Sequence, residues 1–163
     1  MLARMSLVPV GIALGSNLGN RAAELSAGIF FLRSLSANGE LMQSERIVTT
    51  PVDCPPGSEP FLNAVVEIQL DPELLPPREL LRRLQAFEIE RGRPAKHAVN
   101  APRPLDLDIL YYGDQVVRQP DLVIPHPRAA ERRFVLEPLS HLRPELILPG
   151  QTKTVRQLLH DTH

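Results

Sequence analysis

Hydrophobic residues recur along this chain with the two periods that distinguish strands from helices. Apolar or alternating runs predict strands over residues 7–17, 41–50, 61–70 and 105–113, and a short one over 114–120. Apolar residues at helical spacing predict helices over residues 20–35 and 71–92, and a short C-terminal helix over 152–162. The order strand, helix, strand, strand, helix, strand, followed by a C-terminal extension, is typical of a ferredoxin-like α+β sandwich. We therefore expect a mostly antiparallel sheet with helices on one face and long proline-rich loops.

Local signals indicate where these elements begin, end and face the core. Asn20 is a favoured N-cap for the first helix, and Gly92 is a favoured terminator for the second. In the strand over residues 61–70, the alternation predicts that Leu62, Ala64 and Val66 lie on one face.

The composition is that of one globular domain. The chain has 163 residues, which is enough for a single sizeable core, and we treat residues 1–163 as one domain. Its 17 prolines are spread along the sequence, which favours loops of fixed shape over one disordered tract. The net charge of −1 gives no electrostatic reason to expect nucleic acid or an anionic membrane as a partner.

The sequence favours a cytoplasmic protein without a disulfide framework. It contains no run of about 18 apolar residues of the kind that spans a membrane. Pro9 and Gly11 interrupt the apolar N-terminal segment, and no small-residue cleavage site follows, so we expect no signal peptide. Cys54 is the single cysteine, and we expect it to be a buried or inert thiol.

The segment "APRPLDLDIL", residues 101–110, holds the strongest chemical signal. Residues two apart in a strand share a face, so Asp106 and Asp108 lie side by side while Leu105, Leu107 and Ile109 face the core. Two neighbouring carboxylates repel each other unless a cation lies between them, and Mg²⁺ prefers such oxygen ligands. The pair alone is equally compatible with an acidic, solvent-exposed strand face.

Basic residues flank this pair in sequence. Arg93 and Arg103 stand on either side of Lys96 and His97, and two prolines enclose Arg103. Arginine offers a planar fork to phosphate oxygens and stabilises charge that grows in a transition state. The cations could also form salt bridges with the carboxylates, so the sequence leaves a phosphate site and a salt-bridge lattice both open.

Other candidate groups carry weaker signals. The turn at residues 15–17, "GSN", matches neither of the glycine-rich phosphate-binding patterns. His126 is held between two prolines and has either a structural role or a role as a donor to phosphate. Phe61 and Phe134 are expected in the core, but they would sandwich a flat heterocycle, with Asn63 at its polar edge, if they faced each other across a cleft.

Five motifs in this order resemble those of the 6-hydroxymethyl-7,8-dihydropterin pyrophosphokinase family. They are "GIALGSNLGNR", "TTP" with "FLNAVVE", "LQAFEIERGR", "APRPLDLDIL" and "IPHPRAAERRFVLEPL". The resemblance runs from about Val10 to Leu148. It implies a ferredoxin-like α+β fold that binds ATP and two Mg²⁺ ions beside a pterin pocket. It also implies transfer of the β,γ-pyrophosphoryl group of ATP to the pterin hydroxymethyl oxygen, with release of AMP, in folate biosynthesis.

The resemblance assigns a role to each matching residue. It implies that Asp106 and Asp108 bind the metal ions and, with Arg93 and Arg103, form the catalytic set. The implied ATP-binding residues are Glu88, Arg93, Arg103, His126 and Arg132. The implied pterin-binding residues are Gly15, Asn17, Thr50, Pro51, Asp53, Phe61, Asn63 and Phe134.

Three positions depart from the family pattern. Asn100 lies where some members have a tryptophan that closes over the site, and Ala95 lies where some have a second mobile arginine. Asp121 lies where some have an arginine that reaches ATP. Closure of the loop over the site and ATP affinity are therefore open, and the sequence identifies no general base.

Two other functions would use part of the same pattern. A magnesium nucleotidyltransferase also uses a DxD strand after a GS turn, but there the turn closely precedes the acidic pair, whereas Ser16 lies 90 positions before Asp106 here. A non-catalytic binding module would have lost an aspartate or a key arginine, and this chain keeps them. We expect a monomer or weak dimer whose partners are two small-molecule substrates.

Overall fold

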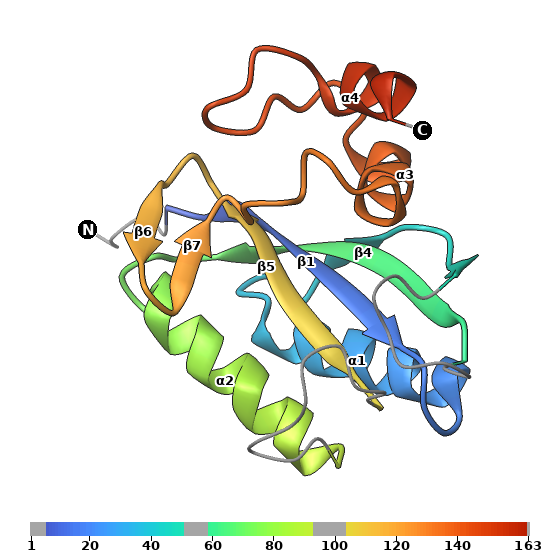
Figure 1. The fold of residues 1–163 in the computed structure, drawn as a ribbon. Coiled ribbons are helices and arrows are strands. Elements are labelled where there is room, and N and C mark those ends of the chain that lie inside the picture. Colours follow the sequence, from blue (N-terminus) through green and yellow to red (C-terminus); the bar gives the residue numbers. More distant parts are fainter. Residues whose placement is uncertain (1–5, 51–58, 93–103, 163) are drawn as a thin grey trace.

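The computed structural model describes residues 6–50, 59–92 and 104–162, and Figure 1 shows its elements. The strands of the main sheet are β1 (Val8–Ser16), β2 (Leu41–Gln43), β3 (Ile47–Thr49), β4 (Phe61–Leu70) and β5 (Asp106–Tyr112). A separate hairpin consists of β6 (Val117–Gln119) and β7 (Leu122–Ile124). The helices are α1 (Arg21–Leu35), α2 (Pro77–Glu90), α3 (Arg133–Leu142) and α4 (Val155–Asp161).

The main sheet has the strand order of the ferredoxin-like fold. Its order is β2-β4-β1-β5, β3 pairs with β4 beyond β2, and every neighbouring pair is antiparallel. With α1 between β1 and β2 and with α2 between β4 and β5, the predicted α+β class is confirmed.

The strand predicted over residues 41–50 is two short strands, and Ser44 explains the interruption. Its backbone N–H donates to the Val65 carbonyl, while its hydroxyl accepts from the Val65 N–H, each at 2.9 Å. The side chain thus takes the place of a ladder carbonyl, so β2 and β3 each pair with β4 but do not form one continuous strand.

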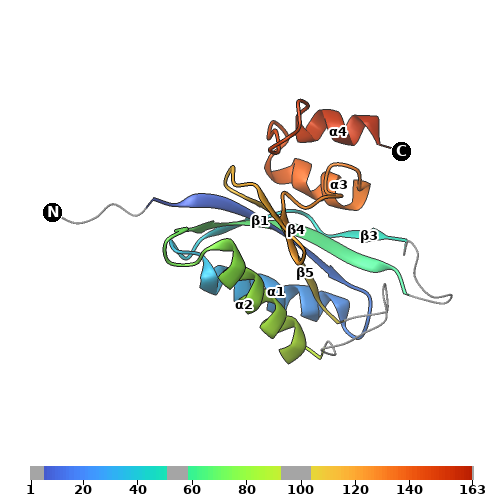
Figure 2. The same ribbon diagram turned by 60° about the vertical axis from the view of Figure 1, so that its left-hand side comes forward.

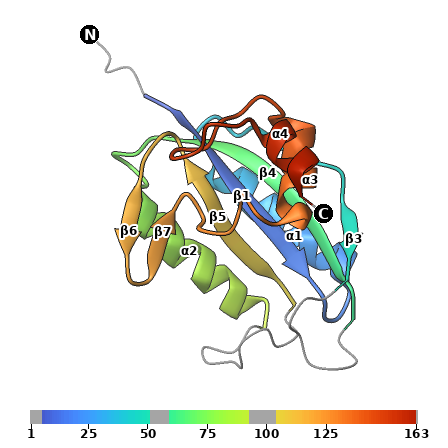
Figure 3. The same cartoon turned by 45° about the horizontal axis from the view of Figure 1, so that its top comes forward.

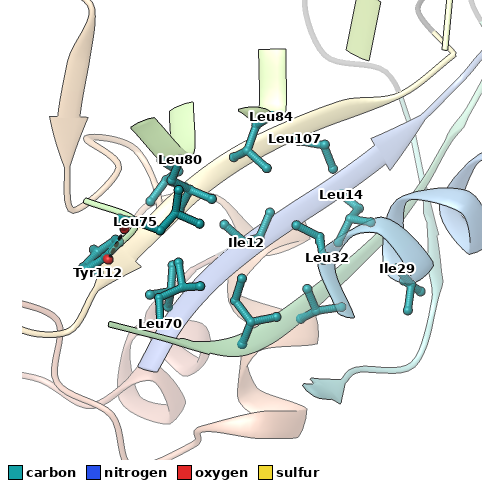
Figure 4. Close-up of a cluster of buried hydrophobic side chains, with 14 of the residues drawn as sticks. Ile12, Leu14, Ile29, Leu32, Leu70, Leu75, Leu80, Leu84, Leu107 and Tyr112 are labelled. Atoms are coloured by element: carbon teal, nitrogen blue, oxygen red, sulfur yellow. Dashed lines mark hydrogen bonds between the residues drawn. The ribbon is translucent and has the colours of Figure 1, made fainter. Parts of the chain in front are cut away.

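Helices α1 and α2 cover one face of the sheet, and the largest apolar core lies beneath them (Figures 1 and 4). Figure 4 shows side chains from the strands, such as Ile12 and Leu107, pointing toward Leu32 of α1 and Leu84 of α2. Ala64 and Val66 are buried in this core and Leu62 packs against it, so the face predicted for β4 is confirmed.

The predicted ends of these two helices are also confirmed. The Asn20 side chain accepts from the Ala23 backbone N–H at 3.1 Å and so caps the first turn of α1. Gly92 follows the end of α2 with φ of 108°, a left-handed conformation that favours glycine. Phe31 and Phe87 stack between the helices with ring centroids 4.1 Å apart.

Helix α3 lies against the opposite face of the sheet and α4 packs on α3, so the expectation of helices on one face was incomplete (Figures 2 and 3). The physical reason is that β4 and β5 are apolar on both faces over part of their length. Val65, Leu110 and Tyr111 form a second buried cluster with residues of α3 and α4. This apolar surface needs cover, and the C-terminal extension supplies it.

A bulge in β5 allows its last residues to serve both faces. Ile12 of β1 pairs with Ile109 and Gly11 pairs with Tyr111, which leaves Leu110 as the extra residue. Leu110 and Tyr111 therefore both join the cluster under α3, while Tyr112 joins the core under α1 and α2. A Cβ on Gly11 would lie 2.3 Å from the Tyr111 ring, so the glycine makes room for this ring.

Within the described residues, no helix is both long and apolar enough to cross a membrane.

Candidate active site

Two small residues of β1, Gly15 and Ala13, form a floor between β4 and β5, on the face of the sheet toward α3. Gly15 pairs with Asn63 of β4 on one side and with Asp106 of β5 on the other. Ala13, on the same face, pairs with Asp108. Neighbouring strands are roughly 4.8 Å apart, so the Asn63 and Asp106 backbones stand about 10 Å apart across Gly15. An amide and a carboxylate thus bound the two sides of a floor that has no side chain at Gly15.

The acidic side of this floor is Asp106 and Asp108. Both are half-buried, and the residues between and beyond them, Leu107 and Ile109, are buried in the core under α1 and α2. Leu105 is also buried in that core. The alternation predicted for this strand is confirmed, and it directs both carboxylates to the α3 face of the sheet.

The loop between β7 and α3 brings His126 to the acidic pair. The His126 backbone N–H donates to the carbonyl of Leu110, the bulge residue, at 2.9 Å. Burial lowers the pKa of His126, Arg132 and Arg128 lower it further, and Asp106 acts in the opposite direction. The imidazole Nδ1 accepts from the Arg128 backbone N–H at 3.2 Å, so the proton of the neutral ring is on Nε2.

Arg132 reaches the same region from the N-cap of α3. Burial lowers its pKa first and Arg128 lowers it further, while Asp108 and Asp106 counteract both effects. Its guanidinium carbon lies 5.4 Å from the centroid of the Phe134 ring, within cation–π range. The structure therefore brings the predicted residue Arg132 within electrostatic range of both aspartates, and His126 within range of Asp106.

Arg128 is a member of this group that sequence reasoning missed. It is exposed, and its positive charge acts on both His126 and Arg132. The sequence signal that could have identified Arg128 is its place directly after "IPHP". A proline-rich loop that holds a histidine in place also holds the neighbouring residue.

The opposite side of the floor carries the predicted aromatic and amide residues. A Cβ built on Gly15 would lie 3.1 Å from Asn63 Oδ1 and 3.4 Å from a ring carbon of Phe61. Phe134 is in the first turn of α3, half-buried against the cluster beneath that helix. Phe61, Asn63 and Phe134 thus belong to one face of the sheet, and the sandwich of a heterocycle between the two rings stays a prediction.

Asn63 is held by a residue that the sequence did not single out. Its side chain is buried, and Nδ2 donates to the Thr49 hydroxyl at 2.5 Å. Thr50, the residue predicted to bind the pterin, is exposed and lies just beyond the end of β3. Asn17, predicted beneath the same site, is buried directly after β1.

Glu88 lies on the other face of the sheet. It is buried on α2, and its Oε2 accepts from the Leu107 backbone N–H at 2.7 Å. This contact satisfies a donor on the open edge of β5. Its predicted contact with ATP stays a prediction.

Asp121 lies away from the acidic pair, in the turn between β6 and β7. It receives hydrogen bonds from both terminal nitrogens of Arg78, near the start of α2, at 2.7 and 3.0 Å. That helix end is near the far end of β5, where the Tyr112 hydroxyl donates to the Leu75 carbonyl. The hydrogen bond from Arg78 holds the pKa of Asp121 below its usual range.

Several predicted positions lie outside the described residues. They are Pro51, Asp53, Cys54, Arg93, Ala95, Lys96, His97, Asn100 and Arg103.

The donor set fits Mg²⁺ that is shared with a phosphate ligand. Over residues 6–50, 59–92 and 104–162, no three His, Cys, Asp or Glu side chains gather to enclose a metal. Mg²⁺ is commonly held by only one or two carboxylates plus substrate phosphates, and it retains several waters. Asp106 and Asp108, with His126 and Arg132 beside them, provide such a set.

Comparison with known proteins is consistent with this arrangement. Residues 11–144 match the model of the 7,8-dihydro-6-hydroxymethylpterin-pyrophosphokinase family. Two relatives named 2-amino-4-hydroxy-6-hydroxymethyldihydropteridine pyrophosphokinase cover most of the chain. The Pseudomonas aeruginosa protein is 37% identical over 86% of this chain and 83% of its own length. The Haemophilus influenzae protein is 34% identical over 93% of each.

Other similar proteins are longer. The chain spans between 18% and 32% of the length of three further relatives, which are 37–39% identical to it. Among solved structures, a Plasmodium falciparum HPPK-DHPS triple mutant with pteroate superposes with a TM-score of 0.70 over 95% of this chain and 43% of its own. At 14% identity this last likeness supports the fold alone.

Proposed function

Because the chain belongs to the 7,8-dihydro-6-hydroxymethylpterin-pyrophosphokinase family, and is therefore a pyrophosphokinase of folate biosynthesis, we propose that it diphosphorylates 6-hydroxymethyl-7,8-dihydropterin. The β,γ-pyrophosphoryl group of ATP passes to the hydroxymethyl oxygen, and the products are the pterin diphosphate and AMP. The observation that carries this proposal is the row Asn63–Gly15–Asp106, which sets an amide and a carboxylate on either side of a residue without a side chain.

The acidic side of the floor binds the triphosphate. Asp106 and Asp108 are the residues that would hold two Mg²⁺ ions, which when bound neutralise phosphate charge and orient the triphosphate. Arg132 and His126 supply donors next to them, and the family resemblance adds Arg93 and Arg103, together with a contact from Glu88.

The opposite side binds the pterin. Phe61 and Phe134 stack on the two faces of the ring, and Asn63 bonds to its polar edge. Gly15 leaves room for the ring above the sheet, and by resemblance Asn17, Thr50, Pro51 and Asp53 complete the pocket. The hydroxymethyl arm then points across the floor toward Asp106.

The reaction is an in-line displacement at the β-phosphorus. The pterin hydroxymethyl oxygen bonds to this phosphorus, its proton passes to water, and the bond from the phosphorus to the α,β-bridging oxygen breaks. AMP leaves with that oxygen and its electron pair. Arg132 stabilises the charge that grows on the phosphate oxygens, and neutral His126 donates from Nε2. In the ligand-free protein, burial lowers the pKa of His126 and so favours the neutral ring.

We also propose that residues 1–163 act as one domain in the cytoplasm. The partners are two small molecules, without nucleic acid or membrane, and the protein is a monomer or weak dimer. The net charge of −1 and the absence of a spanning helix among the described residues support this proposal.

The test is a product assay with the purified protein, ATP, Mg²⁺ and 6-hydroxymethyl-7,8-dihydropterin. We expect AMP and pterin diphosphate in equal amounts. ADP as the product would indicate transfer of the γ-phosphoryl group alone, and pyrophosphate release would indicate a nucleotidyltransferase. Binding of both ligands without turnover would indicate a non-catalytic module. Each of these three outcomes contradicts the proposal.

A further inference from the structure

The two ends of the Asn63 side-chain amide have different neighbours, Thr49 at the nitrogen and Gly15 at the oxygen. The amide NH₂ is bonded to Thr49 Oγ1 at 2.5 Å. The amide oxygen lies over the floor, 3.1 Å from the point where a Gly15 Cβ would be. The side chain is 7% exposed, so bulk water does not compete freely for these groups.

Thr49 reaches this amide because of the register of β3. Ile47 is the residue directly opposite Asn63, and Thr49 is two positions further along on the same face. Diagonal neighbours of this kind are within reach of each other in an antiparallel pair. The neighbouring Val48 points to the other face and is 64% exposed. The contact therefore follows from strand alternation and does not depend on the loop after β3.

An asparagine amide can rotate about its last bond, and that rotation costs little when nothing holds the group. A hydrogen bond to one end fixes the plane of the amide and leaves the other end for a ligand. Here Thr49 takes the NH₂ end, so the carbonyl oxygen is the group presented toward the floor. An oxygen in this position accepts from N–H groups, such as those on the aminopyrimidine half of a pterin.

We propose that Thr49 is a positioning residue for pterin recognition, whose hydroxyl holds the Asn63 amide in the orientation that binds the heterocycle. This inference rests on the proposed function, because it takes the pterin as the ligand of Asn63. Thr49 does not touch the reacting atoms, which lie on the acidic side of the floor. Its effect is therefore on binding of the pterin and not on the chemical step.

The test compares Thr49→Val, which keeps the shape and removes the hydroxyl, with Thr49→Ser, which keeps the hydroxyl. We expect Thr49→Val to raise the KM for the pterin about fivefold, as the loss of one hydrogen bond would. The KM for ATP and kcat should stay within about twofold, and Thr49→Ser should restore most of the pterin affinity. Val48→Thr, on the exposed face of the same strand, is the matched control and should behave as the wild type.

Asn63→Ala separates failure of this inference from failure of the proposed site. A raised pterin KM in Asn63→Ala with an unchanged one in Thr49→Val would overturn the role of Thr49 alone. An unchanged pterin KM in Asn63→Ala would overturn the pterin site itself. A fall in kcat with equal rises in both KM values in Thr49→Val, or no recovery in Thr49→Ser, would mean that Thr49 is merely structural.

Discussion

At the scale of single residues, two glycines of β1 matter because they have no side chain. Gly15 lies between an amide and a carboxylate, and a methyl group there would touch Asn63 and Phe61. Gly11 lies four residues earlier on the same face, and the Tyr111 ring occupies the position that a Gly11 side chain would take. The same strand thus has one glycine that makes room for its own packing and another that we propose makes room for a ligand.

Gly15→Ala should weaken pterin binding without unfolding the protein. The added Cβ would lie 3.1 Å from Asn63 Oδ1, which is tighter than an ordinary contact, so the amide must shift. We expect the pterin dissociation constant, measured by calorimetry, to rise about tenfold, since a misplaced polar group costs about 1–3 kcal/mol. The free energy of unfolding in urea is the control and should change by less than about 1 kcal/mol. Wild-type pterin affinity in this variant would contradict the floor assigned to Gly15.

Asp106→Asn and Asp108→Asn should each reduce kcat by about two orders of magnitude or more. The reason is that each removes one of two charged ligands from a site that must neutralise a triphosphate. Steady-state kinetics at saturating ATP and Mg²⁺ measures this.

Asp121→Asn is the matched control for these variants. Asp121 is a carboxylate paired with Arg78 at the far end of β5, and its loss should leave kcat unchanged. Equal effects of all three substitutions would remove the special role of the acidic pair.

At the scale of elements, one buried polar cluster holds α3 on the sheet. Glu67 of β4 has a side chain that is 1% exposed, and it accepts two hydrogen bonds from Arg143, which follows α3. The Tyr111 hydroxyl donates to the same carboxylate at 2.7 Å. Burial, together with the charge of Glu67, raises the pKa of Tyr111 well above its usual value. The helix that carries Phe134 is thereby fixed at its C-terminal end.

Glu67→Ala should destabilise the fold by about 3 kcal/mol, because it leaves a buried tyrosine hydroxyl and a half-buried guanidinium without their acceptor. Tyr111→Phe, which removes only one donor, should cost about 1 kcal/mol. Urea unfolding followed by circular dichroism measures both. A smaller loss in Glu67→Ala than in Tyr111→Phe would show that the carboxylate is not the centre of the cluster.

The limits of sequence prediction are clearest at this scale. Strands and helices with a strong period were predicted, as was the face of Asp106 and Asp108, since alternation alone determines it. Helix α3 was not predicted, because Pro138 inside it has no N–H to donate and masks the helical signal. Thr49 and Arg128 were missed because their importance depends on strand register and loop packing, which residue spacing does not contain.

At the scale of the whole molecule, one sheet contributes residues to two hydrophobic cores, one on each face, and to the candidate site. The faces differ: α1 and α2 cover one face, while α3 lies on part of the other and carries α4 on its outer side (Figure 2). The candidate site lies where this second face is lined by small and polar residues. Stability is therefore shared between two layers, and the buried tyrosines at the end of β5 connect them.

Stability should fall in alkaline solution as these tyrosines ionise. Burial raises the pKa of Tyr112 to about 12, whereas an unfolded tyrosine ionises near 10. The folded state therefore keeps a proton that the unfolded state loses, so the free energy of unfolding falls as pH rises from about 10 to 12.

Tyr112→Phe should lose less stability than the wild type between pH 9 and pH 11, as measured by urea unfolding at both values. The phenylalanine has no proton to release in either state, so its contribution does not change with pH. An equal loss in both proteins would show that Tyr112 does not contribute to the alkaline transition.

The extra residue at Leu110 divides β5 into two stretches that can vary independently. Before Leu110, regular alternation directs Asp106 and Asp108 to the α3 face. After it, the extra residue shifts the alternation by one position, so Tyr111 lies under α3 and Tyr112 lies under α1 and α2. We therefore expect substitutions that rebuild the tyrosine stretch together with Gly11, Glu67 and Arg143 to leave the direction of Asp106 and Asp108 unchanged. The fastening of the C-terminal helices can then change while the two carboxylates proposed to hold the metal ions keep their place.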